Sequence, residues 1–217
     1  IFYNTISTGS FTVTVLSSDS GSGVHHVTFP VTVSAGGVDT SSTYTNAYSW
    51  TTGDTYSSTA TVTCFDDDRN SDTDTFDVTR DITAPGSGSI TFTDGYYTST
   101  SVAITYTTGT DAGSGLNTSN GRILRQSATL SDGSCGGYGS WSEIVEESDG
   151  SYTDTTVSSG NCYVYRYEIF DNVMNGVNYT SASEAMVDTT TPTCTVLAIN
   201  QTVGGGYQYV SGKILYY

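Results

Sequence analysis

Three short motifs occur twice in this chain, in the same order, and they constrain its fold more than any other feature. The motifs read D-x-G-S-G-apolar, F-D-x-x-x-N and D-x-T-x-P; they occupy residues 19–24, 65–70 and 81–85 in the first copy and residues 111–116, 170–175 and 188–192 in the second. An internal repeat of this kind predicts similar modules in series. Such arrays usually serve as spacers or binding units, so the repeat points away from an enzyme.

Alternating polar and apolar residues predict that these modules are built of strands. Residues 12–16, 60–64 and 101–106 alternate with a period of two and are rich in β-branched side chains, which is typical of half-buried strands. We expect residues 141–147 to be strand or irregular, and we find no window of helical periodicity. In the second module we expect strands at residues 88–93, 101–107, 121–127, 139–146, 152–157, 161–170 and 177–187.

The length of 217 residues suits two domains of about 100 residues each. We expect residues 1–81 to form a sandwich that lacks its first strands and residues 82–188 to form a complete one. Residues 189–217 would then be the first strands of a following domain. The tail at residues 213–217 also resembles the head at residues 1–4, which suggests one period of about 214 residues from a longer array. A chance likeness of two short aromatic strands remains the alternative.

Composition limits the partners. The formal net charge is −16, from 22 acidic and 6 basic residues, which excludes a nucleic-acid binder and disfavours docking on anionic lipid. No window approaches the ~20 apolar residues of a membrane-spanning helix. The single lysine and the abundance of Ser, Thr, Gly and Tyr favour an extracellular or cell-surface protein. The chain begins with Ile1, so we expect a mature product or an excerpt.

The motifs resemble those of bacterial immunoglobulin-like repeat domains, the Big-type tandem modules of large cell-surface and secreted proteins. The resemblance rests on D-x-G-S-G-V, the D-x-x-x-N loop, D-x-T-A-P at the boundary and residues 160–167, and it covers nearly the whole chain. It implies tandem immunoglobulin-like β-sandwiches. It does not choose among adhesins, stalks, surface layers and accessory parts of secreted hydrolases. Cys64 and the acidic run at residues 66–68 depart from the common pattern.

In an immunoglobulin-like sandwich the B–C and F–G loops lie at the end where the chain enters, so acidic residues should meet there. Oxygen ligands in such number suit calcium, as in cadherin-type linkers. Within the chain the expected ligands are Asp81, Asp111, Asp171 and Asn175. At the equivalent junction between copies they are Asp188 with Asp19, Asp66, Asp68 and Asn70 of the following unit. The alternative is that these side chains only cap tight turns.

The four cysteines predict two disulfides. Cys135 and Cys162 lie within one domain, 27 residues apart, and their bond should contribute roughly 3 kcal/mol. Cys64 lies in the F strand of the opening domain, and Cys194 lies in the first strand of the incomplete third domain. We therefore predict that residues 192–217 complete the opening sandwich of the next copy, and that Cys194 bonds Cys64 of that copy.

Other constellations point less clearly to chemistry. His25 and His26 are the only histidines, have no recognisable nucleophile motif, and should face opposite sides of a strand. Residues 143, 146 and 147 are glutamates that could act on glycosides, although a solvated edge fits them better. The many tyrosines could form a carbohydrate-stacking face, but cross-strand ladders are the preferred interpretation.

These observations favour a non-enzymatic, structural extracellular module of a bacterial surface. It would be one period of a tandem array, a stalk, fibre or filament, stiffened by junction calcium and disulfides and joined head to tail with copies of itself. The alternative is an adhesive or carbohydrate-binding module of a secreted enzyme or adhesin, with surface glycans as partners.

Overall fold

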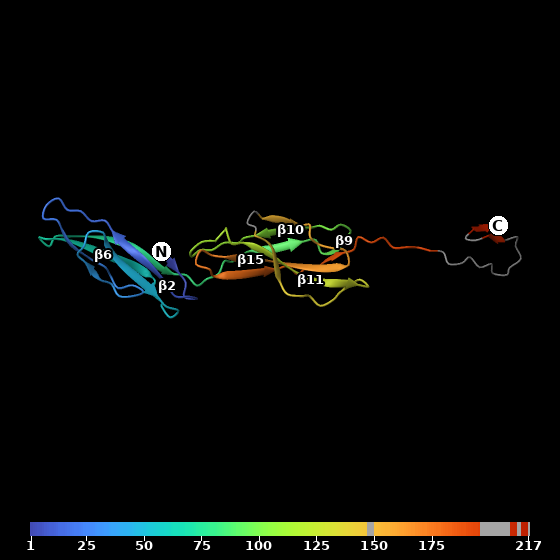
Figure 1. Cartoon of the computed structure of the whole chain (residues 1–217), viewed down its shortest axis with the longest axis horizontal. Coiled ribbons are helices and arrows are strands. Elements are labelled where there is room, and N and C mark those ends of the chain that lie inside the picture. Colours follow the sequence, from blue (N-terminus) through green and yellow to red (C-terminus); the bar gives the residue numbers. More distant parts are fainter. Residues whose placement is uncertain (147–149, 196–208, 212–213, 217) are drawn as a thin grey trace.

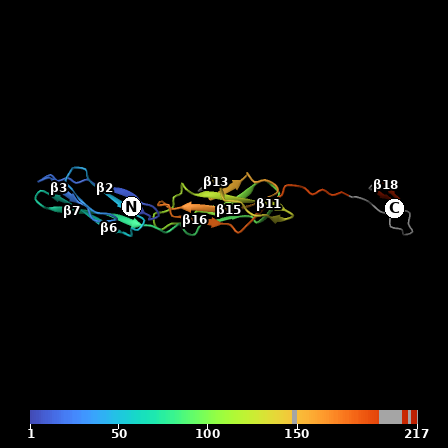
Figure 2. The same ribbon diagram turned by 60° about the horizontal axis from the view of Figure 1, so that its bottom comes forward.

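The computed structural model describes residues 1–146, 150–195, 209–211 and 214–216. Every regular element in these residues is a β-strand, and none of them belongs to a helix long and apolar enough to cross a membrane. All strands before residue 189 form two immunoglobulin-like β-sandwiches that follow one another along the long axis of the molecule (Figures 1 and 2). The predicted all-β fold is therefore confirmed.

The first sandwich consists of seven strands. They are β1 (Phe2–Tyr3), β2 (Gly9–Val15), β3 (Val24–Thr28), β4 (Val38–Asp39), β5 (Tyr44–Trp50), β6 (Ser58–Asp66) and β7 (Ser71–Arg80). A five-stranded sheet with the order β1-β7-β6-β3-β4 forms one layer, and the pair β2-β5 forms the other. Inward-facing side chains of both layers make the core, which is centred on Val27, Phe29, Tyr44, Tyr48 and Val62.

The second sandwich is larger. It contains β8 (Ser89–Phe92), β9 (Gly95–Tyr97), β10 (Val102–Thr107), β11 (Arg122–Ser131), β12 (Ser134–Cys135), β13 (Ser142–Glu146), β14 (Ser151–Asp154), β15 (Asn161–Phe170), β16 (Gly176–Thr180) and β17 (Ala185–Val187). One layer has the order β14-β10-β8. The other has the order β12-β11-β15-β17-β9, with β13 paired to β11 and β16 paired to β15.

Strict alternation of side chains builds the second core. Along β10, Val102, Ile104 and Tyr106 are buried while the residues between them are exposed. Along β15, Tyr165 and Tyr167 are fully buried, and Tyr167 stacks on Tyr106 of the opposite layer with ring centroids 4.5 Å apart. The period of two that predicted these strands from the sequence thus corresponds to one buried and one solvent-facing side.

The two sandwiches share one strand plan. In the first, β1 runs parallel to β7, with Tyr3 opposite Arg80; in the second, β9 runs parallel to β17, with Tyr97 opposite Val187. Likewise β2 pairs with β5 as β10 pairs with β14. The prediction that the opening sandwich lacks its first strands is too broad, because β1 is present. The first sandwich has no counterpart of β8 among the described residues, and only β4 pairs with β3 where both β12 and β13 pair with β11.

Several local features differ from the sequence-based expectations. The short strands β9 and β12 were not predicted, since two or three residues carry no readable alternation. The predicted strand at residues 177–187 is divided into β16 and β17. Residues 142–146 form a strand, β13. A register shift between Val24 and His26 brings the imidazoles of His25 and His26 together, with their Nδ1 atoms 2.6 Å apart, so the two rings do not face opposite sides.

The C-terminal segment leaves the second sandwich at the end that is remote from the first (Figure 1). Within it, β18 (Tyr209–Ser211) and β19 (Ile214–Tyr216) pair antiparallel. The sequence predicts that residues 189–217 are the first strands of a further domain. Much of that range, residues 196–208, 212–213 and 217, lies outside the described residues.

Candidate metal site at the junction of the sandwiches

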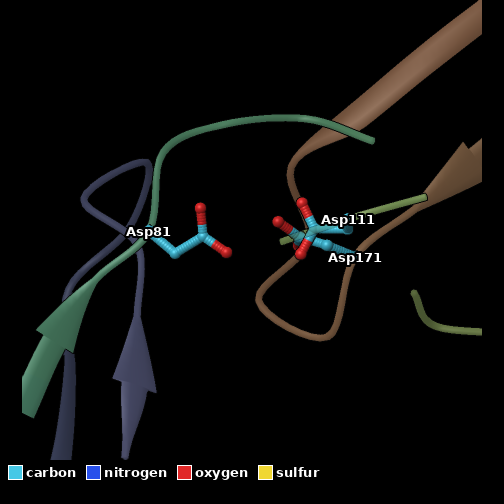
Figure 3. Close-up of side chains that lie close together, drawn as sticks. All are labelled: Asp81, Asp111 and Asp171. Atoms are coloured by element: carbon cyan, nitrogen blue, oxygen red, sulfur yellow. The ribbon is translucent and has the colours of Figure 1, made fainter. Parts of the chain in front are cut away.

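Asp81 is the residue at which the first sandwich ends. Its backbone N–H continues the parallel pairing of β1 and β7 by donating to the carbonyl of Tyr3 at 2.8 Å. Its side chain is only 5% exposed and points away from the first sandwich, toward the second (Figure 3). One carboxylate oxygen accepts the N–H of Thr83 at 3.1 Å, which fixes the first turn of the linker.

Asp111 and Asp171 lie in the two loops of the second sandwich that face this linker. Asp171 is fully buried and accepts the N–H groups of Val173 and Asn175 at 2.9 and 2.8 Å. Asp111 accepts the N–H of Gly115 at 2.7 Å. These contacts are the turn chemistry that aspartate provides in tight loops, and they hold both carboxylates in fixed directions.

The three carboxylates converge. One oxygen from each of Asp81, Asp111 and Asp171 lies within 4.8 Å of the others. Figure 3 shows Asp81 opposite the other two, across the space between the sandwiches. The linker is held there by direct bonds, because Ser114 N–H donates to Asp81 Oδ2 at 2.7 Å and Asn175 Nδ2 donates to the Asp81 carbonyl at 3.1 Å.

Asn175 is predicted from the sequence to be a calcium ligand, and in the structure its amide nitrogen is a hydrogen-bond donor. Besides the Asp81 carbonyl, Nδ2 donates to Asp171 Oδ2 at 2.6 Å. Asn4 makes a second tie between the sandwiches, since its Nδ2 donates to the carbonyl of Val173. These amide contacts join backbone and side chains from both modules into one junction.

The close approach of Asp81 requires a glycine in the facing loop. A Cβ added to Gly113 would lie 2.3 Å from Asp81 Oδ2, well inside any van der Waals contact. The corresponding glycine of the first sandwich, Gly21, has only ordinary contacts, with Asp19 Oδ2 at 3.4 Å as its nearest neighbour. The G of the D-x-G-S-G motif therefore has a steric role where a linker aspartate packs on it.

The charge at the junction is unbalanced. The three ion pairs of the described residues all use Arg122 or Arg125, and none of them reaches these carboxylates. At 4.8 Å and an effective dielectric of about 20, two carboxylates repel by about 3.5 kcal/mol. Burial raises the pKa of Asp81, but the N–H groups of Ser114 and Thr83 outweigh it, so this pKa lies below its ordinary value. Oxygen ligands of this number and charge suit Ca²⁺.

The far end of the first sandwich repeats the same two loops. Asp19 accepts the N–H groups of Gly21 and Gly23 at 2.9 and 2.8 Å. Asp66 accepts both the N–H and the side-chain Nδ2 of Asn70 at 2.7 Å, as Asp171 does from Asn175. Asp19, Asp66 and Asn70 line one hollow, in which no linker aspartate lies among the described residues.

The remaining two predicted ligands lie elsewhere. The side chain of Asp68 is exposed and does not line that hollow. Asp188 lies at the opposite end of the second sandwich, where it accepts the N–H of Thr190 at 2.9 Å. Its backbone N–H donates to the carbonyl of Tyr97, just as the backbone N–H of Asp81 donates to the carbonyl of Tyr3. Asp188 is thus a second linker aspartate in the same local geometry, but it belongs to no cluster of three metal-ligating side chains in the described part of the chain.

The cysteines fall into two classes. Cys135 and Cys162 form a disulfide with a Cα–Cα distance of 5.8 Å. Cys64 is half-buried and free, and Cys194 is exposed and free. The complete second sandwich separates these two within the chain (Figure 1).

The other candidate groups of the sequence do not assemble into a site among the described residues. Glu143 pairs with Arg122 at 3.4 Å on the edge strand β13, Glu146 is exposed on the same strand, and residue 147 lies outside the described residues. Of the tyrosines considered for an aromatic face, Tyr163, Tyr165 and Tyr167 are buried in the core, whereas Tyr96 is 61% exposed.

Sequence reasoning missed the residues that close the junction. Gly113 and Ser114 are internal positions of the D-x-G-S-G motif, and their repetition was the available signal. Their functions depend on where Asp81 packs, which the motif alone does not state. No sequence pattern marked Asn4, because it precedes residues 12–16, the first run in which polar and apolar residues alternate.

Comparisons with known proteins give distant structural likenesses only. No family model matches the chain, and no curated protein sequence matches it. Among solved structures, fibronectin(III)-like modules of Clostridium thermocellum CbhA share 12% identity over 86% of this chain and 88% of that chain, with a TM-score of 0.36. A titin fragment shares 12% identity over 85% of this chain, at a TM-score of 0.46, and the matched region is 59% of that fragment.

A third solved structure contains fibronectin domains of chicken CNTN1. It shares 11% identity with this chain, covers 83% of this chain and 64% of that one, and has a TM-score of 0.31.

Proposed function

We propose that this chain is a non-catalytic structural unit of an extracellular, cell-surface array of bacterial Big-type modules. Its role is mechanical: it sets the distance and direction between neighbouring modules. The observation that carries the proposal is the junction at which Asp81, Asp111 and Asp171 converge while hydrogen bonds tie linker and loops together. A hinge between independent domains needs no such buried contact.

Calcium is the proposed stiffening ion of this junction. Extracellular calcium modules bind with Kd values of roughly 10⁻⁴–10⁻³ M, so 10 mM calcium would stabilise the junction by about 1.4–2.7 kcal/mol. The disulfide Cys135–Cys162 supports an oxidising, extracellular location. Copies of the chain are the proposed partners. Asp188 occupies the position in the second linker that Asp81 has in the first, and Asp19 and Asp66 lie in loops like those of Asp111 and Asp171, which face Asp81.

The test is thermal unfolding and small-angle scattering of the full chain in calcium, magnesium and chelator. We expect calcium, but not magnesium, to raise the melting temperature by several degrees and to narrow the distribution of particle lengths. Asp111→Asn should abolish the effect, since it removes one ligand charge with little change in shape. Asp132→Asn is the matched control, because Asp132 is an exposed turn aspartate of the same sandwich. Equal responses of both variants to calcium would contradict the proposal.

A further inference from the structure

The first sandwich has an open groove where the second sandwich holds a strand. In the second sandwich β8 pairs with β10, with Phe92 opposite Ile104 and Ile90 opposite Tyr106. In the first sandwich the corresponding edge of β2 has no strand partner among the described residues. A groove of about 710 Å³ follows this edge, and its apolar lining includes Val13, Val15, Leu16, Val62 and Phe76, together with Cys64.

The apolar groups of this groove are exposed to an unusual degree for an immunoglobulin-like sandwich. Leu16 is 93% exposed, and Val13 and Val15 are only half-buried. Their counterparts Ile104 and Tyr106 are 1% and 2% exposed beneath β8. An unpaired edge beside apolar side chains is a template for strand addition.

We propose that this groove receives residues 193–199 of a second copy of the chain, as an added antiparallel strand. This inference rests on the proposed head-to-tail array and gives its contact. Aligning the two D-x-T-x-P motifs places residues 193–199, which read T-C-T-V-L-A-I, in the position of residues 86–92. Leu197 then corresponds to Ile90 and Ile199 to Phe92, so apolar residues fall at both core positions. The segment carries no charge, which suits a groove bordered by Asp72 and Asp74.

The pairing register follows from the second sandwich. There Tyr106 faces Ile90 and Ile104 faces Phe92, and pairing continues to the bridge between Gly86 and Thr110. Transferred to β2, this register places Leu197 opposite Val15 and Ile199 opposite Val13. Cys194 of the second copy then arrives level with residues 17–18, which line the same two hollows as Cys64. The two free cysteines are thereby brought to one place by a register chosen without reference to them.

A reciprocal change in side-chain size supports the same register. In the second sandwich a Cβ on Gly88 would lie 2.2 Å from the ring of Tyr179, so only glycine fits that position of the added strand. The pairing of β6 with β7 makes Asp74 the counterpart of Tyr179, and the alignment makes Thr195 the counterpart of Gly88. The smaller Asp74 leaves space that the larger Thr195 would fill.

The second copy must be a different chain. Residues 193–195 of one chain lie beyond the end of its second sandwich that is remote from the first (Figures 1 and 2). The contact therefore joins the tail of one copy to the head of the next. Repetition of such a heterologous contact gives a linear filament. The step that locks it is oxidation of two thiols, Cys64 and Cys194 of the second copy, to a disulfide by a disulfide-exchange catalyst or molecular oxygen, with loss of two protons and two electrons.

The experiment uses the full chain and its variants Cys64→Ser and Cys194→Ser under oxidising conditions. We expect the unmodified chain to form a covalent ladder, and an equimolar mixture of the two variants to form a dimer linked only through the remaining Cys64 and Cys194. Each variant alone should stay monomeric on a non-reducing gel. Dimers of equal yield from either variant alone, or a Cys64–Cys194 bond within one chain, would overturn the proposal. Fluorescence of Trp50 verifies that the first sandwich is folded, and Cys64→Ala replaces Cys64→Ser if it is not.

A pair of tail variants tests the register. Leu197→Asp places a charge at the inward position opposite Val15, whereas Ala198→Asp places it at the neighbouring outward position. We expect the first to slow ladder formation roughly tenfold to hundredfold, the range for a lost buried leucine, and the second to change it by less than about twofold. Equal effects would refute this register.

Repeating the oxidation in chelator separates this inference from the calcium proposal. Ladders that persist without calcium support strand addition whether or not the junction binds the ion. Calcium-dependent stiffening of single chains that form no ladders would overturn strand addition and leave the junction proposal standing.

Discussion

The glycine at the junction allows a test that changes no charge. Gly113→Ala places a methyl group 2.3 Å from Asp81 Oδ2, so linker and loop must separate by about 1 Å to reach normal contact. Gly21→Ala is the matched control, because it alters the same position of the same motif at a loop where no linker packs. Neither glycine has the positive φ that would itself strain an alanine.

The expected magnitude follows from the bonds that the methyl group displaces. The N–H of Ser114 donates to the Asp81 carboxylate at 2.7 Å, and a hydrogen bond to a charged group contributes about 1.5–3 kcal/mol. The bond from Asn175 to the Asp81 carbonyl is neutral and contributes about 0.5–1.5 kcal/mol. Gly113→Ala should therefore lower the coupling free energy between the two sandwiches by about 2–4.5 kcal/mol. Gly21→Ala should change it by less than about 0.5 kcal/mol.

The two tryptophans make this coupling measurable. Trp50 lies in β5 of the first sandwich, and Trp141 lies beside β13 of the second, so Trp141→Phe and Trp50→Phe backgrounds each report on one module. Urea unfolding of each background gives two midpoints, which should move apart in Gly113→Ala and stay together in Gly21→Ala. Midpoints that respond equally to both substitutions would show that the junction contact does not couple the modules.

Two further predictions concern the second sandwich. Asp154→Ala should destabilise it by about 3–5 kcal/mol in urea, because Asp154 is fully buried and accepts hydrogen bonds from Arg125 and Tyr165 at 2.7 and 2.9 Å. Burial raises the pKa of Asp154, but the hydrogen bonds outweigh it and the pKa lies below its ordinary value of about 3.9. Its stabilisation is therefore present above that value and lost as pH falls through the lower folded pKa; an acid-unfolding midpoint unchanged by Asp154→Asn would contradict this. Replacing Cys135 and Cys162 by serine should lower the free energy of unfolding by roughly 3 kcal/mol, and a loss below about 1 kcal/mol would show that the cross-link constrains the unfolded chain little.

Much of the fold could be predicted because the sequence patterns that specify it are local and occur in both modules. Alternation over five or more residues marks β2, β10 and β15, and the repeated motifs mark the loops between such strands. Once the modules are taken as immunoglobulin-like, the loops with Asp111 and Asp171 must lie at one end, so their approach to Asp81 could also be predicted.

The remaining features depend on contacts that no local pattern encodes. The strand β1 is two residues long and forms because it can pair parallel to the end of β7. The Asn175 amide reaches the Asp81 carbonyl of another module, and this contact depends on where the linker packs. The groove beside β2 is visible only when the first sandwich is compared with the second, strand by strand, because the sequence of β2 is that of an ordinary half-buried strand.

In the proposed array, strand addition and the acidic junction are parts of one contact. Within the chain, Asp81 precedes Pro85 and β8 in a single segment, and Tyr179 Oη donates to the Pro85 carbonyl at 2.9 Å, so the linker and the edge strand are held together. The second linker has the same spacing, from Asp188 through Pro192 to residues 193–199. A tail strand that enters the groove of the next copy therefore delivers Asp188 to the loops of Asp19 and Asp66. Once one of the two contacts has formed, the groups of the other are held close together at a high effective concentration. Weak calcium binding and a short added strand can therefore stabilise together a joint that neither would stabilise alone.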